Sequence, residues 1–408
     1  MRRVLLLILV LAACSGGTAS SPTSHLTTVS TTALPPTTTI PLPPTTTTTT
    51  PPPTTSTLPP TTTTSLVPPD GLTAAARTLV EVETISGGLA AKSIVASGDG
   101  LFFAQNMMYR HTISVFDRDY QLVATIADEV TPSEFGHGED FPGTYLGSPV
   151  EAAFTSDGSH AYVSNYRMYG GGLSTAASDG CSQGNWPDSF VYRIDTSTLE
   201  IDQLLRVGPV PKFLAVTPDD RFVLVSNWCG FDVSVLEVES GNEIARIEVG
   251  RHPRGIAVTP DSSTAYIAVM GSRDIALLDL ATLELDYLED VGSGPRHLVM
   301  SPDGAILYVS LNGEDRLAKV DMVTGEVLGR VTTGDAPRSM TISDDGTALY
   351  VVNYNSDTMS KVRTSDMTEI EEHRVSDKPI GITYDAATRR VWVSAYSGTI
   401  EIFEDRAP

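Results

Sequence analysis

Residues 249–261 read VGRHPRGIAVTPD, and nearly the same phrase returns along the chain. It appears as VGPVPKFLAVTPD at 207–219, as VGSGPRHLVMSPD at 291–303 and, more loosely, as TTGDAPRSMTISDD at 332–345. The prolines at 211, 253, 295, 337 and 379 are each 42 residues apart. A fixed period of this length indicates a row of equivalent structural units.

Each unit contains four short apolar stretches separated by Asp, Gly and Ser turns. One unit supplies RGIAV (254–258), AYIAVM (265–270) and IALLD (275–279), and a fourth stretch is EVLGRVTTG (326–334) in the next unit. β-Branched and aliphatic residues bounded by turn residues indicate strands. Four strands in about 42 residues are typical of a propeller blade, so we expect an all-β propeller.

The number of blades follows from the ends of the repeat. Two further units begin near residues 92 and 148, and the last unit, 380–405, contains only three strands. The stretch RTLVEVETISGG (77–88) reads as the missing fourth strand. We therefore expect seven four-stranded blades, the last closed by this N-terminal strand, which leaves no open sheet edge.

The second strands LYVVN (349–353), AYVSN (161–165) and FVLVSN (222–227) resemble those of the YVTN family of bacterial and archaeal surface propellers. The resemblance covers about 330 residues and departs from the pattern in blade 2, where an insertion delays the third strand. It implies a seven-bladed propeller. It specifies function poorly, because the family includes surface-layer and adhesion-like proteins beside relatives of lactonases and of redox-enzyme propellers.

The N-terminal region predicts export. Residues 1–13 combine a short basic start with an apolar run and end in a motif, LAAC (11–14), that resembles the lipobox of bacterial lipoproteins. Cys14 would then be lipidated, the alternative being an ordinary secretory signal. Residues 14–69 form a Thr/Pro-rich stalk without charges, predicted to be disordered and suited to O-glycosylation. We expect a membrane-anchored, monomeric propeller at 70–408, displayed at the cell surface or in the cell envelope.

Charge and cysteine content limit the partners and the redox setting. Acidic residues outnumber basic ones by 50 to 27, which argues against nucleic acid. With Cys14 lipidated, Cys181 and Cys229 form the remaining pair, and an oxidising compartment favours a disulfide between them.

Two insertions are expected on one face of the ring. They are residues 127–147, between the first two blades, and 167–188, within blade 2. They carry the aromatic and histidine side chains His137, Tyr145, Tyr169 and Trp186, and such loops often confer specificity. The alternative is that they merely cap the scaffold.

Basic residues recur at the start of the innermost strands. Lys212, Arg254, Arg296 and Arg338 each follow a repeat proline, and Lys92 aligns with them, whereas blades 2 and 7 carry Val150 and Ile380. Converging cations would focus a positive potential and suit a carboxylate or phosphate. The alternative is that each cation pairs with an acid or a carbonyl of the next blade. Trp228 and His297 are further candidate binding residues on this face.

Catalytic and metal signals are weak. Glu151 is predicted near the channel, where it could serve as a base or, with Asn165, Asn227 or Asn353, contribute to a calcium site. Those asparagines more often satisfy backbone groups. We see no nucleophile elbow, phosphate loop or zinc signature, and expect no metal and no cofactor.

The sequence favours a binding module for a surface protein or an anionic small molecule. The alternative is a lactonase-like hydrolase at the channel mouth, with the arginines holding a carboxylate and Glu151 or a histidine as base.

Overall fold

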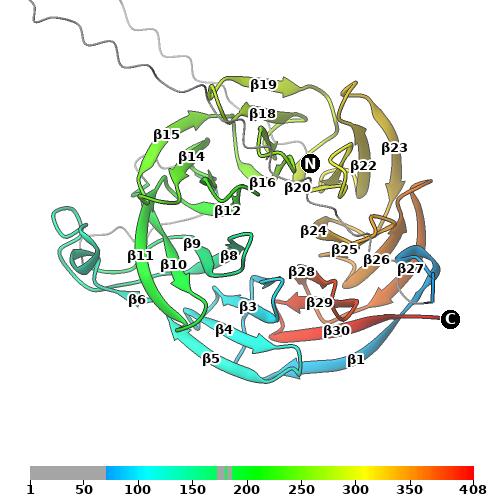
Figure 1. Cartoon of the computed structure of the whole chain (residues 1–408), viewed down its shortest axis with the longest axis horizontal. Coiled ribbons are helices and arrows are strands. Elements are labelled where there is room, and N and C mark those ends of the chain that lie inside the picture. Colours follow the sequence, from blue (N-terminus) through cyan, green and yellow to red (C-terminus); the bar gives the residue numbers. More distant parts are fainter. Residues whose placement is uncertain (1–69, 172–179, 182–185) are drawn as a thin grey trace, which may run out of the picture. The chain divides into compact units, whose positions relative to one another are not determined.

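The computed structural model describes residues 70–171, 180–181 and 186–408, which form a ring of seven four-stranded antiparallel sheets (Figure 1). The all-β, seven-bladed expectation is confirmed. The predicted signal peptide and stalk, with Cys14, lie outside the described residues. Within the described part of the chain, no helix combines the length and apolar character needed to cross a membrane.

The first three blades follow the chain from the inner to the outer strand. Blade 1 comprises β2 (Ser93–Ala96), β3 (Leu101–Asn106), β4 (Thr112–Asp117) and β5 (Leu122–Ala127). Blade 2 comprises β8 (Pro149–Phe154), β9 (His160–Asn165), β10 (Ser189–Asp195) and β11 (Glu200–Val207). Blade 3 comprises β12 (Pro211–Val216), β13 (Phe222–Asn227), β14 (Asp232–Glu237) and β15 (Glu243–Glu248).

The next three blades repeat this order. Blade 4 comprises β16 (Pro253–Val258), β17 (Thr264–Val269), β18 (Ile275–Asp279) and β19 (Leu285–Leu288). Blade 5 comprises β20 (Pro295–Met300), β21 (Ile306–Leu311), β22 (Arg316–Asp321) and β23 (Val327–Thr332). Blade 6 comprises β24 (Pro337–Ile342), β25 (Ala348–Asn353), β26 (Thr358–Arg363) and β27 (Thr368–Arg374).

Blade 7 joins the two ends of the described chain. Its inner strands are β28 (Pro379–Asp385), β29 (Arg390–Ala395) and β30 (Thr399–Arg406), and its outer strand is β1 (Thr78–Ser86). β1 pairs antiparallel with β30, from Thr78 opposite Arg406 to Ser86 opposite Thr399. The predicted closure by the N-terminal strand is thus present, and Figure 1 shows β1 and β30 side by side at the rim.

Four short elements complete the described chain. A 3-10 turn, η1 (Ala74–Ala76), precedes β1. The insertion between the first two blades contains β6 (Glu129–Val130), η2 (Pro132–Phe135) and β7 (Tyr145–Leu146), and β6 pairs with β7.

Burial explains why the first three strands of each blade are so apolar. Both faces of a blade pack against neighbouring blades, as in the cluster between blades 3 and 4 that contains Leu224, Ile256 and Ile267. The outermost strands face solvent on one side, and β15 and β23 accordingly alternate between exposed and half-buried residues.

The inner strands approach so closely that two positions require glycine. A Cβ at Gly255 would lie 2.8 Å from the Cα of His297 in the next blade, and one at Gly381 would lie 2.6 Å from the Cα of Ser93. These backbone contacts set the diameter of the channel, and with it the spacing of the side chains at its mouth.

Candidate functional site at the channel mouth

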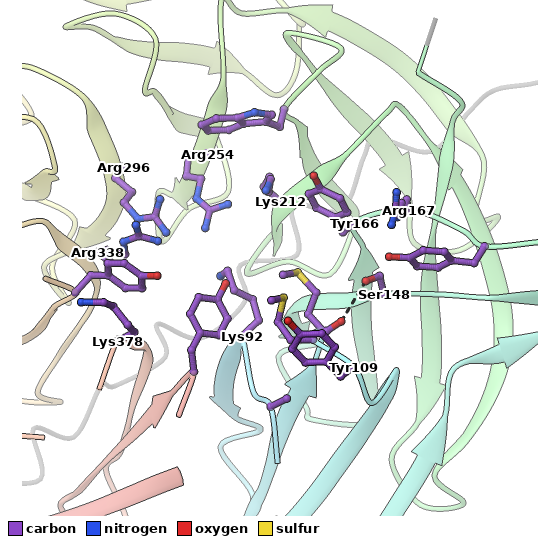
Figure 2. Close-up of a pocket in the computed structure, with 17 residues that line it drawn as sticks. Lys92, Tyr109, Ser148, Tyr166, Arg167, Lys212, Arg254, Arg296, Arg338 and Lys378 are labelled. Carbon is purple, nitrogen blue, oxygen red and sulfur yellow. Dashed lines mark hydrogen bonds between the residues drawn. The ribbon is translucent and has the colours of Figure 1, made fainter. Parts of the chain in front are cut away.

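A cavity of about 620 Å³ lies at one end of the channel, where the blades begin (Figure 2). We call it the mouth cavity. Its volume is typical of small-molecule sites. Seventeen residues line it: Ala90, Lys92, Met107, Met108, Tyr109, Ser148, Tyr166, Arg167, Tyr169, Lys212, Trp228, Arg254, Arg296, Arg338, Tyr354, Lys378 and Tyr396.

A β-bulge that recurs in blades 2 to 7 directs one set of these side chains toward the channel. In blades 2 to 7 the register between the first two strands shifts directly after the initial proline, as between Pro211 and Phe213. Such a bulge redirects a side chain without ending the sheet. The residue after each proline, with Lys92 in blade 1, forms what we call the inner ring: Lys92, Val150, Lys212, Arg254, Arg296, Arg338 and Ile380.

All five cations predicted at this ring line the mouth cavity. Arg167 and Lys378 add two more, and none of the cavity-lining residues described is acidic. Lys92 is 4% exposed and both Arg254 and Arg296 are 6% exposed, so these charges face the cavity rather than bulk water. The arrangement concentrates positive charge in a protein whose formal net charge is −23.

The electrostatic cost of this cluster appears in its titration behaviour. Burial lowers the pKa of Lys92 well below its usual value, and the nearby charge of Arg254 lowers it further. Burial, then the charges of Arg254 and Arg338, likewise lower the pKa of Arg296. The Nζ atom of Lys92 is buried and has no hydrogen-bond partner among the residues that the structure describes. An anion in the cavity would relieve both penalties.

Aromatic rings accompany several of the cations. Lys212 Nζ lies 4.4 Å from the ring centre of Tyr166 and 5.5 Å from that of Trp228. The guanidinium carbon of Arg338 lies 3.5 Å from the ring centre of Tyr354. These two cations therefore contact aromatic faces of the scaffold while they line the mouth cavity.

These aromatic residues occupy a second repeated position, which sequence reasoning missed apart from Trp228. It is the first residue after strand two, and we call the set the outer ring: Met107, Tyr166, Trp228, Met270, Asn312, Tyr354 and Tyr396. In blades 2 to 7 its backbone N–H donates to the carbonyl at the entry of the same blade, as from Tyr166 to Ser148 and from Trp228 to Val210. A partial signal was available, because in blades 1, 2, 3 and 6 the position directly follows the asparagine that ends the second strand.

Glu151 and His297 occupy a deeper position. Glu151 is buried and His297 is half-buried on inner strands, and neither is among the residues that line the mouth cavity. Burial raises the pKa of Glu151, against the opposing charges of Lys92 and Arg254. Burial and the neighbouring charge of Arg296 lower the pKa of His297 to about 3, so its ring is neutral at physiological pH. A ligand in the mouth cavity would therefore contact the cations and not Glu151 or His297.

The structure contains a disulfide between Cys181 and Cys229, with Cα atoms 5.2 Å apart. It joins the second insertion to the loop that carries Trp228. Arg167 and Tyr169 at the start of this insertion line the mouth cavity, while residues 172–179 and 182–185 lie outside the described residues.

The other insertion residues are placed apart from the cavity. His137 Nε2 lies 3.0 Å from the carbonyl oxygen of Leu204 on outer strand β11. Tyr145 is buried, and its hydroxyl donates to the carbonyl of Gly171. Trp186 is half-buried and is not a lining residue of the mouth cavity.

The asparagines considered as calcium ligands serve the backbone and neighbouring side chains. Asn165 Oδ1 accepts from the backbone N–H of Ser148 at 3.0 Å, and Asn353 Nδ2 donates to Thr358 and Ser360. Asn227 Nδ2 donates to Asp232 and Ser234. Among the described residues, no group of three or more His, Cys, Asp or Glu side chains is arranged to hold a metal ion.

Comparison with known proteins agrees with the fold. Residues 253–379 match the family described as "Lactonase, 7-bladed beta-propeller". Hydrazine synthase of Kuenenia stuttgartiensis is similar in structure, with a TM-score of 0.62 and 15% sequence identity over 79% of this chain and 98% of that one. No curated protein matches the chain in sequence. At this level of identity, the structural likeness concerns the fold alone.

Proposed function

We propose that this protein is a binding module that captures an anionic small molecule in the mouth cavity. The observation that carries the proposal is the set of seven cations around a cavity of about 620 Å³ without an acid among its described lining residues. Holding like charges close together is costly because they repel, so an anion gains both the attraction and the relief of that repulsion. Arginine adds geometric selectivity, because its planar fork matches carboxylate and phosphate.

The N-terminal sequence supports a place for this activity. Lipidation at Cys14 and a Thr/Pro-rich stalk over 15–69 would hold the propeller outside the cytoplasmic membrane, where it would meet solutes of the envelope. In this proposal a monomer suffices, because all seven cations come from one ring. A protein partner that contacts the two insertions is a further possibility that the same location would allow.

The test is ligand-induced stabilisation of the purified protein. A ligand bound only by the folded state raises stability by about 2.7 kcal/mol when present at 100 times its Kd. We expect carboxylates, phosphates or sugar phosphates to raise the melting temperature, and the double substitution Arg254→Ala, Arg296→Ala to abolish the rise.

The matched control is Arg221→Ala with Arg363→Ala. It removes two arginines whose side chains are 65% and 40% exposed, and so the same charge, from positions outside the mouth cavity. The control should respond to anions as the unmodified protein does. If no anion stabilises the unmodified protein, or if both double variants lose the response equally, the proposal is wrong.

A lactonase-like hydrolase is the second candidate, favoured by the family match over 253–379, which includes Arg254, Arg296 and Arg338. In that case the arginines would stabilise the oxyanion formed as a lactone opens. Turnover of lactones, followed by acid release, would establish it if the Arg254→Ala, Arg296→Ala variant lost turnover while keeping its fold.

A further inference from the structure

The arginine side chains are distributed unevenly around the mouth cavity. Arg254, Arg296 and Arg338 come from three consecutive blades, so the guanidinium groups occupy one sector of the mouth. Figure 2 shows them pointing toward one another on one side of the cavity, with Lys378 beside them. Burial lowers the pKa of Arg296, and the charges of both Arg254 and Arg338 lower it further, as expected for three groups within electrostatic reach of one another.

The opposite sector is rich in tyrosine and methionine and also contains Arg167, whose guanidinium carbon lies 4.1 Å from the ring centre of Tyr169. Met107, Met108 and Tyr109 follow strand β3 of blade 1, and Tyr166 and Tyr169 follow β9 of blade 2. Figure 2 shows Tyr109 and Tyr166 across the cavity from Arg296 and Arg338, with Lys92 between the two sides.

The inner ring reinforces this division. Blades 2 and 7 are the two blades that carry an apolar residue there, Val150 and Ile380, and both side chains are fully buried. They flank Lys92, so blades 7, 1 and 2 bring one inner-ring cation, whereas blades 4, 5 and 6 bring three. The three inner-ring arginines therefore share one sector of the mouth, and the tyrosines and methionines of blades 1 and 2, with Lys92 and Arg167, form the other.

Tyr109 stands out in the sector rich in tyrosine and methionine. It is 89% exposed although it lines the cavity, and its backbone has a φ of 67°, the left-handed region that a bulky residue rarely adopts. A ring held out at the rim in this way gains contact area when a ligand enters beneath it. Tyrosine supplies such area at a small cost in side-chain entropy.

We propose that the ligand is an aromatic anion, which places a planar ring against Tyr109, Tyr166 and the methionines and a carboxylate or phosphate among the three arginines. This inference rests on the proposed function, and it specifies the chemical class of the ligand. The cavity volume is sufficient for a ring together with its charged substituents. Methionine sulfur and tyrosine both make favourable contacts with aromatic rings.

The test compares anions of equal charge with and without a ring. Isothermal titration would use phenyl phosphate against methyl phosphate, and benzene-1,3,5-tricarboxylate against propane-1,2,3-tricarboxylate. We expect the aromatic member of each pair to bind at least tenfold more tightly. Tyr109→Ala should reduce that preference at least fivefold and leave the affinity for the non-aromatic member unchanged within twofold.

Two further variants separate the possible failures. Arg296→Gln should weaken both members of each pair tenfold or more, and Tyr287→Ala, which removes a 39% exposed tyrosine from outer strand β19, should change neither. Equal affinities within each pair, or a preference untouched by Tyr109→Ala, would overturn the aromatic ligand but keep the anion site. Absence of binding by all four anions would overturn both.

Discussion

We expect Lys92 to link anion binding to pH. Its ammonium group is buried without a hydrogen-bond partner among the described residues, and its pKa is lowered by burial and by Arg254, Arg296 and Lys212, against the attraction of Glu151. A bound dianion would favour the charged form and raise that pKa. Binding is therefore expected to take up a proton.

The protonated site binds an anion more tightly, so affinity should be greatest below the lowered pKa of Lys92 in the free protein. It should fall as the pH rises from that value toward the higher pKa of the complex. Sulfate is a suitable probe because its charge is constant over this range. Titration in buffers of different ionisation enthalpy should show proton uptake for the unmodified protein.

Two variants assign the proton. Lys92→Met should abolish the uptake. Glu151→Gln should retain it, because we assign the proton to the Lys92 amine and not to the Glu151 carboxyl group, whose pKa is also shifted, upward, by burial. Proton uptake that survives Lys92→Met would contradict this prediction.

At the same scale, sequence reasoning found the cations but not most of their aromatic neighbours. Arg254, Arg296 and Arg338 could be predicted because one residue type recurs at one position of the repeat. The outer ring keeps its position but varies in identity, from Met107 to Tyr396, so no composition signal marks it. Lys378 precedes its proline instead of following it, and only the folded chain shows that it reaches the same cavity.

At the scale of elements, a buried ion pair connects blade 6 to the closing strands. Lys361 on β26 is fully buried, and its Nζ donates to Asp405 of β30 at 2.5 Å and to the carbonyl of Arg77, next to β1, at 2.8 Å. Asp405 also accepts from the hydroxyl of Tyr350. The closure was predictable from the missing strand, but this network was not, because its residues lie far apart in the repeat.

Removing one partner of this pair should be costly. Lys361→Met leaves Asp405 as a buried acid without its counter-charge, and we expect a loss of about 3–5 kcal/mol in the free energy of unfolding. Urea denaturation followed by circular dichroism measures the loss. The double variant Lys361→Met, Asp405→Leu should be more stable than the single variant, since the fully buried carboxylate is gone and Glu371, 3.4 Å from Lys361 Nζ, is partly exposed and keeps its contact with His373.

The control is Arg363→Met on the same strand. The side chains of Arg363 and its partner Asp366 are 40% and 49% exposed, so water replaces the lost contact and little change is expected. Equal destabilisation by Lys361→Met and Arg363→Met would contradict the assignment of the buried pair.

At the scale of the whole molecule, the fold places the acidic and the basic residues in different regions. The outer surface carries the excess of acids that gives a net charge of −23, and the channel mouth collects cations from five blades at one inner-ring position. Blades 3 to 7 each contribute one or two side chains to the cavity, and blades 1 and 2 contribute more, so no single blade contains the whole site. Binding at the mouth therefore depends on the ring being closed at its rim.

Closure should make the ring one cooperative unit. Leu79 of β1 is 3% exposed and packs with Val391, Val393 and Phe403 of blade 7. We expect Leu79→Ala to lower the free energy of unfolding by about 2–5 kcal/mol, the usual range for truncating a buried leucine. Because loss of the closing strand would release both ends of the ring, this destabilisation should reach distant blades.

Hydrogen exchange measured on peptides tests whether the destabilisation reaches distant blades. In mild denaturant, peptides from β13 of blade 3 and β29 of blade 7 should both exchange faster in Leu79→Ala, by a similar factor. The neighbouring substitution Val80→Ala, at a side chain 38% exposed, should leave both nearly unchanged. Faster exchange confined to blade 7 would show that the rim strand frays locally and that the mouth can stay assembled without it.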